Sequence, residues 1–218
     1  MLGLKIAILG AECTGKTTLA AQLAAASSLR GQSAHAVGEV LREWCEQHGR
    51  TPQAHEQVAI AQAQAQREFA AGTCDVLLAD TTPLMTAVYS DVLLGDSSLY
   101  PFALAHHARY DLTLVMGMDL PWVADGIQRD GALVQAQVDA RLRAVLQGHG
   151  IRFSVVYGYK AQRCECALRA IDQVSARGVS GPHQATERTQ RWQWVCEKCS
   201  DAQCEHQLFT ALLSPSGP

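Results

Sequence analysis

Short apolar segments alternate with longer segments that carry apolar residues at helical spacing. Buried strands are predicted at residues 4–9, 33–37, 75–79, 111–116 and 153–157. Helices are predicted between and after them at residues 17–29, 39–48, 83–94, 100–109, 133–146 and 162–176. Strands that alternate with helices connect through right-handed crossovers, so the pattern predicts an α/β fold with a parallel five-stranded sheet and helices on both faces.

A further helix is predicted between the second and third strands. Its sequence is rich in glutamine and alanine, which are good helix formers. Thr51-Pro52 is typical of a helix start, an N-cap residue followed by proline at the first helical position. We therefore predict one helix from this dipeptide to Ala70.

The regular alternation ends near residue 177 of the 218. Residues 178–190 are polar and rich in Gly, Ser and Thr, which is typical of a linker. Residues 191–218 form a short tail with the densest cysteines of the chain. The division predicted is one α/β domain over residues 1–177, a linker and a Cys-rich C-terminal tail.

Composition narrows the function classes. The net charge is −3, so nothing indicates a chain built to bind nucleic acid by charge alone. Hydrophobic residues make up 48% and charged residues 18%, which is ordinary for a globular protein. Neither a signal peptide nor an apolar run long enough for a membrane span is visible, and we expect a cytoplasmic protein.

One motif carries most of the chemistry. Residues 10–17 match the phosphate-binding pattern G-x-x-x-x-G-K-[ST] at every fixed position, between a predicted strand and a predicted helix. Backbone N–H groups of such a loop surround phosphate oxygens, and the helix N-terminus adds a positive dipole end. Lys16 would meet the β- and γ-phosphates of ATP, and the Thr17 hydroxyl would bind Mg²⁺. The predicted nucleotide-binding residues are Gly10, Ala11, Glu12, Cys13, Thr14, Gly15, Lys16, Thr17 and Thr18.

Three further charged residues follow predicted strands. Asp80 ends an apolar strand, where it would hold Mg²⁺ or take a proton from an acceptor hydroxyl. The alternative is a turn or cap aspartate before Thr81-Thr82-Pro83. Glu39 and Arg42 follow the second strand and would approach the acceptor; their alternative is an exposed helix start, since acids favour the first helical turn.

Several segments together resemble the ribosylnicotinamide kinase domain of NadR-type NAD-biosynthesis proteins and the related AAA-type P-loop ATPases. They are residues 10–18, 38–43, 78–82, 110–112, 119–126 with the motif Pro-Trp-Val-Ala-Asp-Gly, and 156–159 followed by Arg163. The resemblance implies transfer of the γ-phosphoryl of Mg·ATP to the ribose 5′-hydroxyl of nicotinamide riboside. It implies catalytic roles for Lys16, Asp80 and Arg129, and acceptor contacts from Glu39, Arg42, Trp122 and Asp125.

The sequence departs from the family pattern in the lid. The family arginine falls at Gln128 here, and Arg129 comes one residue later, which turns a helical side chain by about 100°. Arg141 and Arg143 are alternative lid arginines. The identity of the acceptor is therefore left open, and a kinase for another small molecule is one alternative. The other alternative is a nucleotide-dependent ATPase or switch that has no acceptor and uses its tail to bind a protein or nucleic acid.

The tail contains Cys196, Cys199, Cys204 and His206 in the order C-x2-C-x4-C-x-H. Thiolates and imidazole suit Zn²⁺, and four ligands predict a structural rather than a catalytic site. Cys164 and Cys166 are alternatives to the histidine, and unliganded thiols are the alternative to a metal. The pair His106-His107 is expected on a helix surface.

Overall fold

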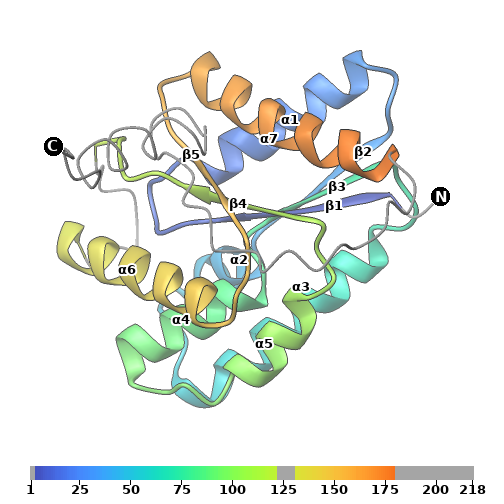
Figure 1. Ribbon diagram of the computed structural model, residues 1–218. Helices are drawn as coiled ribbons and strands as arrows, with labels where there is room; N and C mark the ends of the chain where they lie inside the picture. Colours follow the sequence, from blue (N-terminus) through green and yellow to red (C-terminus); the bar gives the residue numbers. More distant parts are fainter. Residues whose placement is uncertain (1–2, 122–130, 180–218) are drawn as a thin grey trace, which may run out of the picture.

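The computed structural model describes residues 3–121 and 131–179. All of its strand pairs are parallel, and the strands form one sheet in the order β2-β3-β1-β4-β5 (Figure 1). The strands are β1 Leu4–Leu9, β2 Ala34–Val37, β3 Val76–Asp80, β4 Leu112–Met116 and β5 Ser154–Val156. The predicted α/β fold with a parallel five-stranded sheet is confirmed.

Helices cover both faces of this sheet. Helices α1 (Lys16–Leu29) and α7 (Ala161–Val179) pack together on one face. The other face carries α3 (Ala54–Ala70), α4 (Pro83–Leu94), α5 (Tyr100–His107) and α6 (Ala132–Gly148), with α2 (Val40–His48) packed beside α3. Helix α7 runs two residues into the predicted linker.

Two layers of apolar side chains hold the helices to the sheet. In β1, Ile6 and Ile8 point toward α1 and α7, whereas Ala7 and Leu9 point toward the opposite layer, and all four are fully buried. Burial of each large aliphatic side chain contributes roughly 1.5–3 kcal/mol. Residues 6–9 of the central strand are therefore a continuous apolar run because both faces of the strand are covered there.

The predicted start of α3 is wrong by two residues. The helix begins at Ala54, and Gln53 rather than Thr51 is the N-cap residue. Glu56 accepts a hydrogen bond from the Gln53 backbone N–H at 2.7 Å and also pairs with Arg50, so a carboxylate fixes this end. Thr51 and the following proline are instead left to line a cavity described below.

The expectation for the two histidines is also wrong, since both are buried. The His106 Nε2 atom lies 2.6 Å from a carboxylate oxygen of Glu68, and the His107 Nε2 atom lies 2.9 Å from the Thr113 hydroxyl. Burial lowers the pKa of His107 to about 4. Polar partners supplied by α3 and β4 make these positions compatible with the interior, which the local sequence did not indicate.

No helix within the described ranges is long and apolar enough to cross a membrane.

Candidate active site

The loop between β1 and α1 lies at the carboxyl edge of the sheet, where ligands bind in folds of this class. Gly15 immediately precedes α1 with φ 81° and ψ 24°, a left-handed conformation that strains residues with a Cβ. The first amides of a helix have no acceptor within the helix, and Gly15 brings no capping side chain. The positive end of α1 is thus open to an anion.

Lys16 is held at the mouth of this loop. Its Nζ atom donates hydrogen bonds to the carbonyl oxygens of Gly10 and Ala11, each at 2.9 Å, and the residue is buried. The Thr14 hydroxyl donates to the same Ala11 carbonyl at 2.7 Å. Thr17 and Thr18 are exposed at the start of α1. The loop therefore combines the amides at the start of α1, the Lys16 ammonium and the exposed threonines Thr17 and Thr18, which are the groups that a triphosphate requires.

Arg163 of α7 ties the phosphate loop to the neighbouring loops. Its guanidinium donates to the carbonyls of Thr14, Gly117 at 3.0 Å and Gly158 at 2.8 Å, and it forms an ion pair with Asp119. The residue is almost fully buried. In the sequence, Arg163 stands out only through the family resemblance. An arginine that donates to backbone carbonyls of distant loops is not identified by any pattern in its neighbouring residues.

Asp80 lies beside the phosphate loop. As the last residue of β3 it pairs in register with Ile8 of β1, and it is buried. Its Oδ1 atom has no hydrogen-bond partner within the described part of the chain. A buried carboxylate oxygen without a partner, at the edge of the sheet that carries the phosphate loop, is of the kind that Mg²⁺ prefers as a ligand.

A cavity of about 270 Å³ opens next to the phosphate loop. Its walls come from that loop, from α2, from the approach to α3 and from α4. They are Glu12, Lys16, Glu39, Leu41, Arg42, Cys45, Thr51, Pro52, Gln57, Tyr89, Leu93 and Leu94. The fold thus brings four predicted site residues to one cavity, whereas Asp80 does not line it; the four are Glu12, Lys16, Glu39 and Arg42.

Glu39 is buried rather than exposed at a helix start. It is the N-cap residue of α2, yet its side chain makes no capping hydrogen bond and is only 9% exposed. The Arg42 Nε atom lies 3.8 Å from its carboxylate. Burial raises the pKa of Glu39, although the positive charges of Lys16 and Arg42 act to lower it and Asp80 adds a smaller increase. The alternative of an exposed helix start is therefore wrong for Glu39, although Arg42 is exposed, and a carboxylate with a raised pKa lines the cavity.

Two polar residues of the cavity were missed from the sequence. Gln57 of α3 is buried, and its Oε1 atom has no hydrogen-bond partner among the residues described. The pKa of Tyr89 on α4 is raised well above its ordinary value by burial and then by the negative charge of Glu39, so its hydroxyl stays protonated. One lies in a Gln/Ala-rich segment and the other in an apolar helix, so neither stands out by spacing.

The predicted lid residues lie outside the part of the chain that the structure describes. They are Trp122, Asp125 and Arg129, and the zinc candidates Cys196, Cys199, Cys204 and His206 lie outside it as well. The two alternative arginines on α6 are engaged elsewhere: Arg141 with Asp91 at 3.2 Å, and Arg143 with Asp139 at 2.8 Å. Within residues 3–121 and 131–179, no group of three or more His, Cys, Asp or Glu side chains is placed to hold a metal ion.

Solved structures with the same fold include two of the NadR protein. The complex with NR superposes with a TM-score of 0.66 at 18% sequence identity, over 84% of this chain and 53% of that chain. The complex with NAD and AMP-PNP gives 0.64 at 18% identity, over 84% of this chain and 52% of that one. The chain therefore spans about half the length of the NadR chains, and at this identity the likeness shows the fold.

A third structure is matched over its whole length. The deoxyadenosine kinase from M. mycoides, with products dCMP and a flexible dCDP bound, gives a TM-score of 0.55 at 14% identity, over 78% of this chain and 100% of that chain. The sequence matches no curated protein. The family model described as AAA domain matches residues 5–163, which is well over half of the chain and includes the phosphate loop, Glu39, Asp80 and Arg163. This chain belongs to that AAA domain family of P-loop proteins.

Proposed function

We propose that this protein is a kinase that transfers the γ-phosphoryl group of Mg·ATP to a hydroxyl of a small nucleoside, with nicotinamide riboside as the first acceptor to test. One observation carries the proposal. Lys16 of the phosphate loop and the buried carboxylate of Glu39 line the same cavity. A group that would hold the donor phosphates and a group that can take a proton are thus next to one cavity.

The size of the cavity supports a small acceptor. Its volume of about 270 Å³ is near the lower end of small-molecule sites, which run from roughly 300 to 1,000 Å³. Apolar walls from Leu41, Leu93 and Leu94 surround a few polar groups, a combination that suits a nucleoside with a flat base and a polar sugar. The NR held by one NadR structure and the product nucleotides held by the deoxyadenosine kinase support the same class of acceptor.

On the donor side, this chain's residues position phosphates and neutralise charge. The amides from Gly10 to Thr17 and the dipole of α1 would bind the β- and γ-phosphates, and Lys16 would exchange its two carbonyl partners for phosphate oxygens. Arg163 keeps the loop in place through the Thr14 carbonyl. Thr17 and Asp80 would hold Mg²⁺, which supplies charge neutralisation at the β- and γ-phosphate oxygens when bound.

On the acceptor side, Glu39 is the proposed proton acceptor. An acceptor hydroxyl bound in the cavity loses its proton to the Glu39 carboxylate while its oxygen forms a bond to the γ-phosphorus. The bond from that phosphorus to the bridging oxygen breaks, and ADP leaves. The raised pKa of Glu39 favours this role because proton transfer is most efficient when the pKa of the base approaches the working pH.

A panel of nucleosides with ATP and Mg²⁺ tests the proposal. ADP release that depends on one nucleoside, with the matching monophosphate detected by mass spectrometry, is the expected result. ADP release at the same rate without any nucleoside would instead favour a nucleotide-dependent ATPase or switch, the alternative function. No nucleotide binding at all would refute both.

A further inference from the structure

Gln64 of α3 holds the chain on both sides of Glu39. Its Oε1 atom accepts a hydrogen bond from the Val40 backbone N–H at 2.9 Å, and its Nε2 atom donates to the Gly38 carbonyl at 3.4 Å. The residue is only 2% exposed. Val40 is the first residue of α2, so its N–H has no acceptor within the helix, and Glu39 does not cap it. Gln64 supplies that acceptor from another helix.

Only one orientation of the Gln64 amide suits its surroundings. The Val40 N–H can only donate, so it requires the carbonyl oxygen of the side chain. The Gly38 carbonyl can only accept, and the Glu68 Oε1 atom also accepts from the side chain at 3.4 Å, so both partners require the NH₂ group. Together with the Gly38 carbonyl, Glu68 therefore fixes the amide in the orientation that binds Val40.

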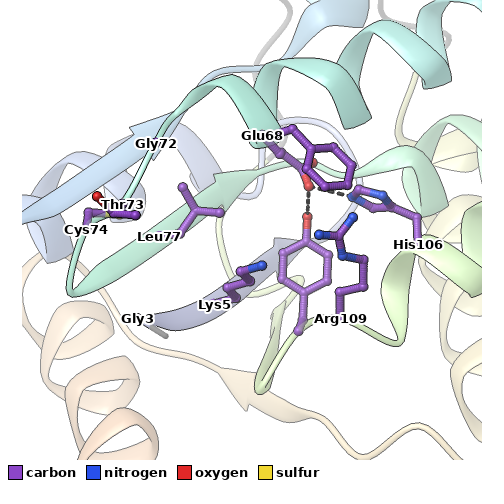
Figure 2. A pocket seen from close by; sticks show the side chains of 11 residues that line it. Gly3, Lys5, Glu68, Gly72, Thr73, Cys74, Leu77, His106 and Arg109 are labelled. Atoms are coloured by element: carbon purple, nitrogen blue, oxygen red, sulfur yellow. Dashed lines mark hydrogen bonds and ion pairs between the residues drawn. The ribbon is translucent and has the colours of Figure 1, made fainter. Parts of the chain in front are cut away.

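Glu68 is fixed in turn at the opposite edge of the sheet. It lies one helical turn after Gln64 and lines a second, smaller cavity of about 170 Å³ near the starts of β1 and β3. Its Oε2 atom accepts a hydrogen bond from the Tyr110 hydroxyl and lies 2.6 Å from His106 Nε2; Figure 2 shows Glu68 and His106 turned toward each other. Glu68 and His106 are both largely buried, so solvent screens their interaction little.

We propose that Gln64 is a positioning residue for the reaction: through Gly38 and Val40 it sets the backbone that aims the Glu39 carboxylate into the cavity, with Glu68 setting the Gln64 amide. The inference rests on the proposed function, because it assigns Gln64 its effect through Glu39. Gln64 does not line the cavity itself, so it acts without touching the acceptor.

The test is a double-mutant cycle between Gln64→Met and Glu39→Gln, with kcat, the KM of the acceptor and the Kd of ATP measured for each variant. Methionine keeps the length and volume of the side chain and removes its hydrogen bonds. We expect Gln64→Met to lower kcat by about 10- to 100-fold, as misplacement of a reacting group by about 1 Å can do, with the Kd of ATP unchanged. In the Glu39→Gln background the same change should lower kcat less than twofold further.

Gln66→Met is the matched control, because Gln66 lies on the same helix but is exposed. It should leave kcat unchanged. Losses that multiply in the double variant would overturn the proposal, since Gln64 would then act independently of Glu39. If Gln64→Met does not fold, Gln64→Asn, which keeps the amide but shortens its reach, enters the same cycle with the same expectation.

A second readout does not depend on the acceptor. Hydrogen exchange of the Val40 amide should accelerate in Gln64→Met and not in Gln66→Met. If no nucleoside is turned over, the proposed function fails, but this measurement still tests whether Gln64 holds the Val40 backbone N–H. Unchanged protection of Val40 would overturn the inference whether or not an acceptor is found.

Discussion

Replacing Glu39 by glutamine should make the protein more stable and nearly inactive. The direction follows from the pKa of this carboxyl, which is raised in the folded protein above its ordinary value of 4.5. A carboxyl with a raised folded-state pKa binds its proton more tightly in the folded than in the unfolded chain. Its ionised form therefore destabilises the fold at neutral pH, and glutamine, which has the same shape and no charge, removes that cost.

The size of the effect is a small difference between opposing contributions. The positive charges of Lys16 and of Arg42, whose Nε atom lies at 3.8 Å, attract the carboxylate; at an effective dielectric constant of about 20 a pair at the Arg42 distance is worth roughly 4 kcal/mol. Desolvation of a buried carboxylate costs several kcal/mol, and the raised pKa shows that this cost prevails. We expect Glu39→Gln to stabilise by about 1 kcal/mol at pH 7, which for this chain length is about 2–4 °C in Tm.

Calorimetry and a kinase assay of the same samples measure both effects. Turnover should fall by about 100-fold or more because the proton acceptor is lost. The stability gain should disappear near pH 4, below the unfolded pKa of 4.5, where Glu39 is protonated in both states.

Glu43→Gln is the matched control on the same helix. The pKa of Glu43 is lowered, first by its hydrogen bonds to Arg67 at 2.5 and 2.6 Å. This change should lower Tm slightly and leave kcat intact, since the pair is half exposed and far weaker than a buried one. A lower Tm for Glu39→Gln at pH 7, or turnover like that of the unchanged protein, would refute the reasoning.

Three other variants test separate parts of the structure. Lys16→Ala should abolish phosphoryl transfer and leave the circular dichroism spectrum unchanged. Turnover by the purified Lys16→Ala variant would refute the proposed mechanism. Arg163→Met should lower the free energy of unfolding by about 3 kcal/mol and weaken ATP binding in calorimetry, because it leaves buried carbonyls unpaired, whereas the exposed Arg169→Met should do neither. His107, with its pKa lowered from 6.5 to about 4, binds its proton more weakly when folded, so stability should fall by roughly 3 kcal/mol from pH 6.5 to pH 4. Urea denaturation of His107→Gln should show a flatter pH dependence, and an equal slope would contradict the assignment.

The strands and the phosphate loop could be predicted because their signals are local. A buried parallel strand is an apolar run, and residues 10–17 contain every fixed position of their motif between a strand and a helix. The start of α3 was misplaced because Thr51-Pro52 offered good local capping, but a carboxylate one turn into the helix, Glu56, competed successfully for the end. Propensity is a weak guide where two caps lie within three residues.

The remaining site residues could not be predicted because their environment comes from distant parts of the chain. Gln57, Gln64 and Gln66 look alike in the sequence, yet one faces the cavity, one binds the backbone beside Glu39 and one is exposed. Only the packing of α3 against α2 separates them. In the same way, His106 became a buried partner because Glu68 reaches it from another helix.

The two edges of the sheet differ in how well their buried polar groups are satisfied, and this difference indicates where substrates bind. Among the described residues that line the amino-edge cavity, no buried side-chain atom lacks a hydrogen-bond partner. At the carboxyl edge, Asp80, Thr81 and Gln57 each have a buried oxygen without one, and Cys13 and Thr81 adopt positive φ. Each such feature costs the fold roughly 1–3 kcal/mol. A ligand that supplies the missing partners would recover part of that cost, so the carboxyl edge is built for binding, whereas the Glu68 cluster at the other edge is complete and serves to hold the fold.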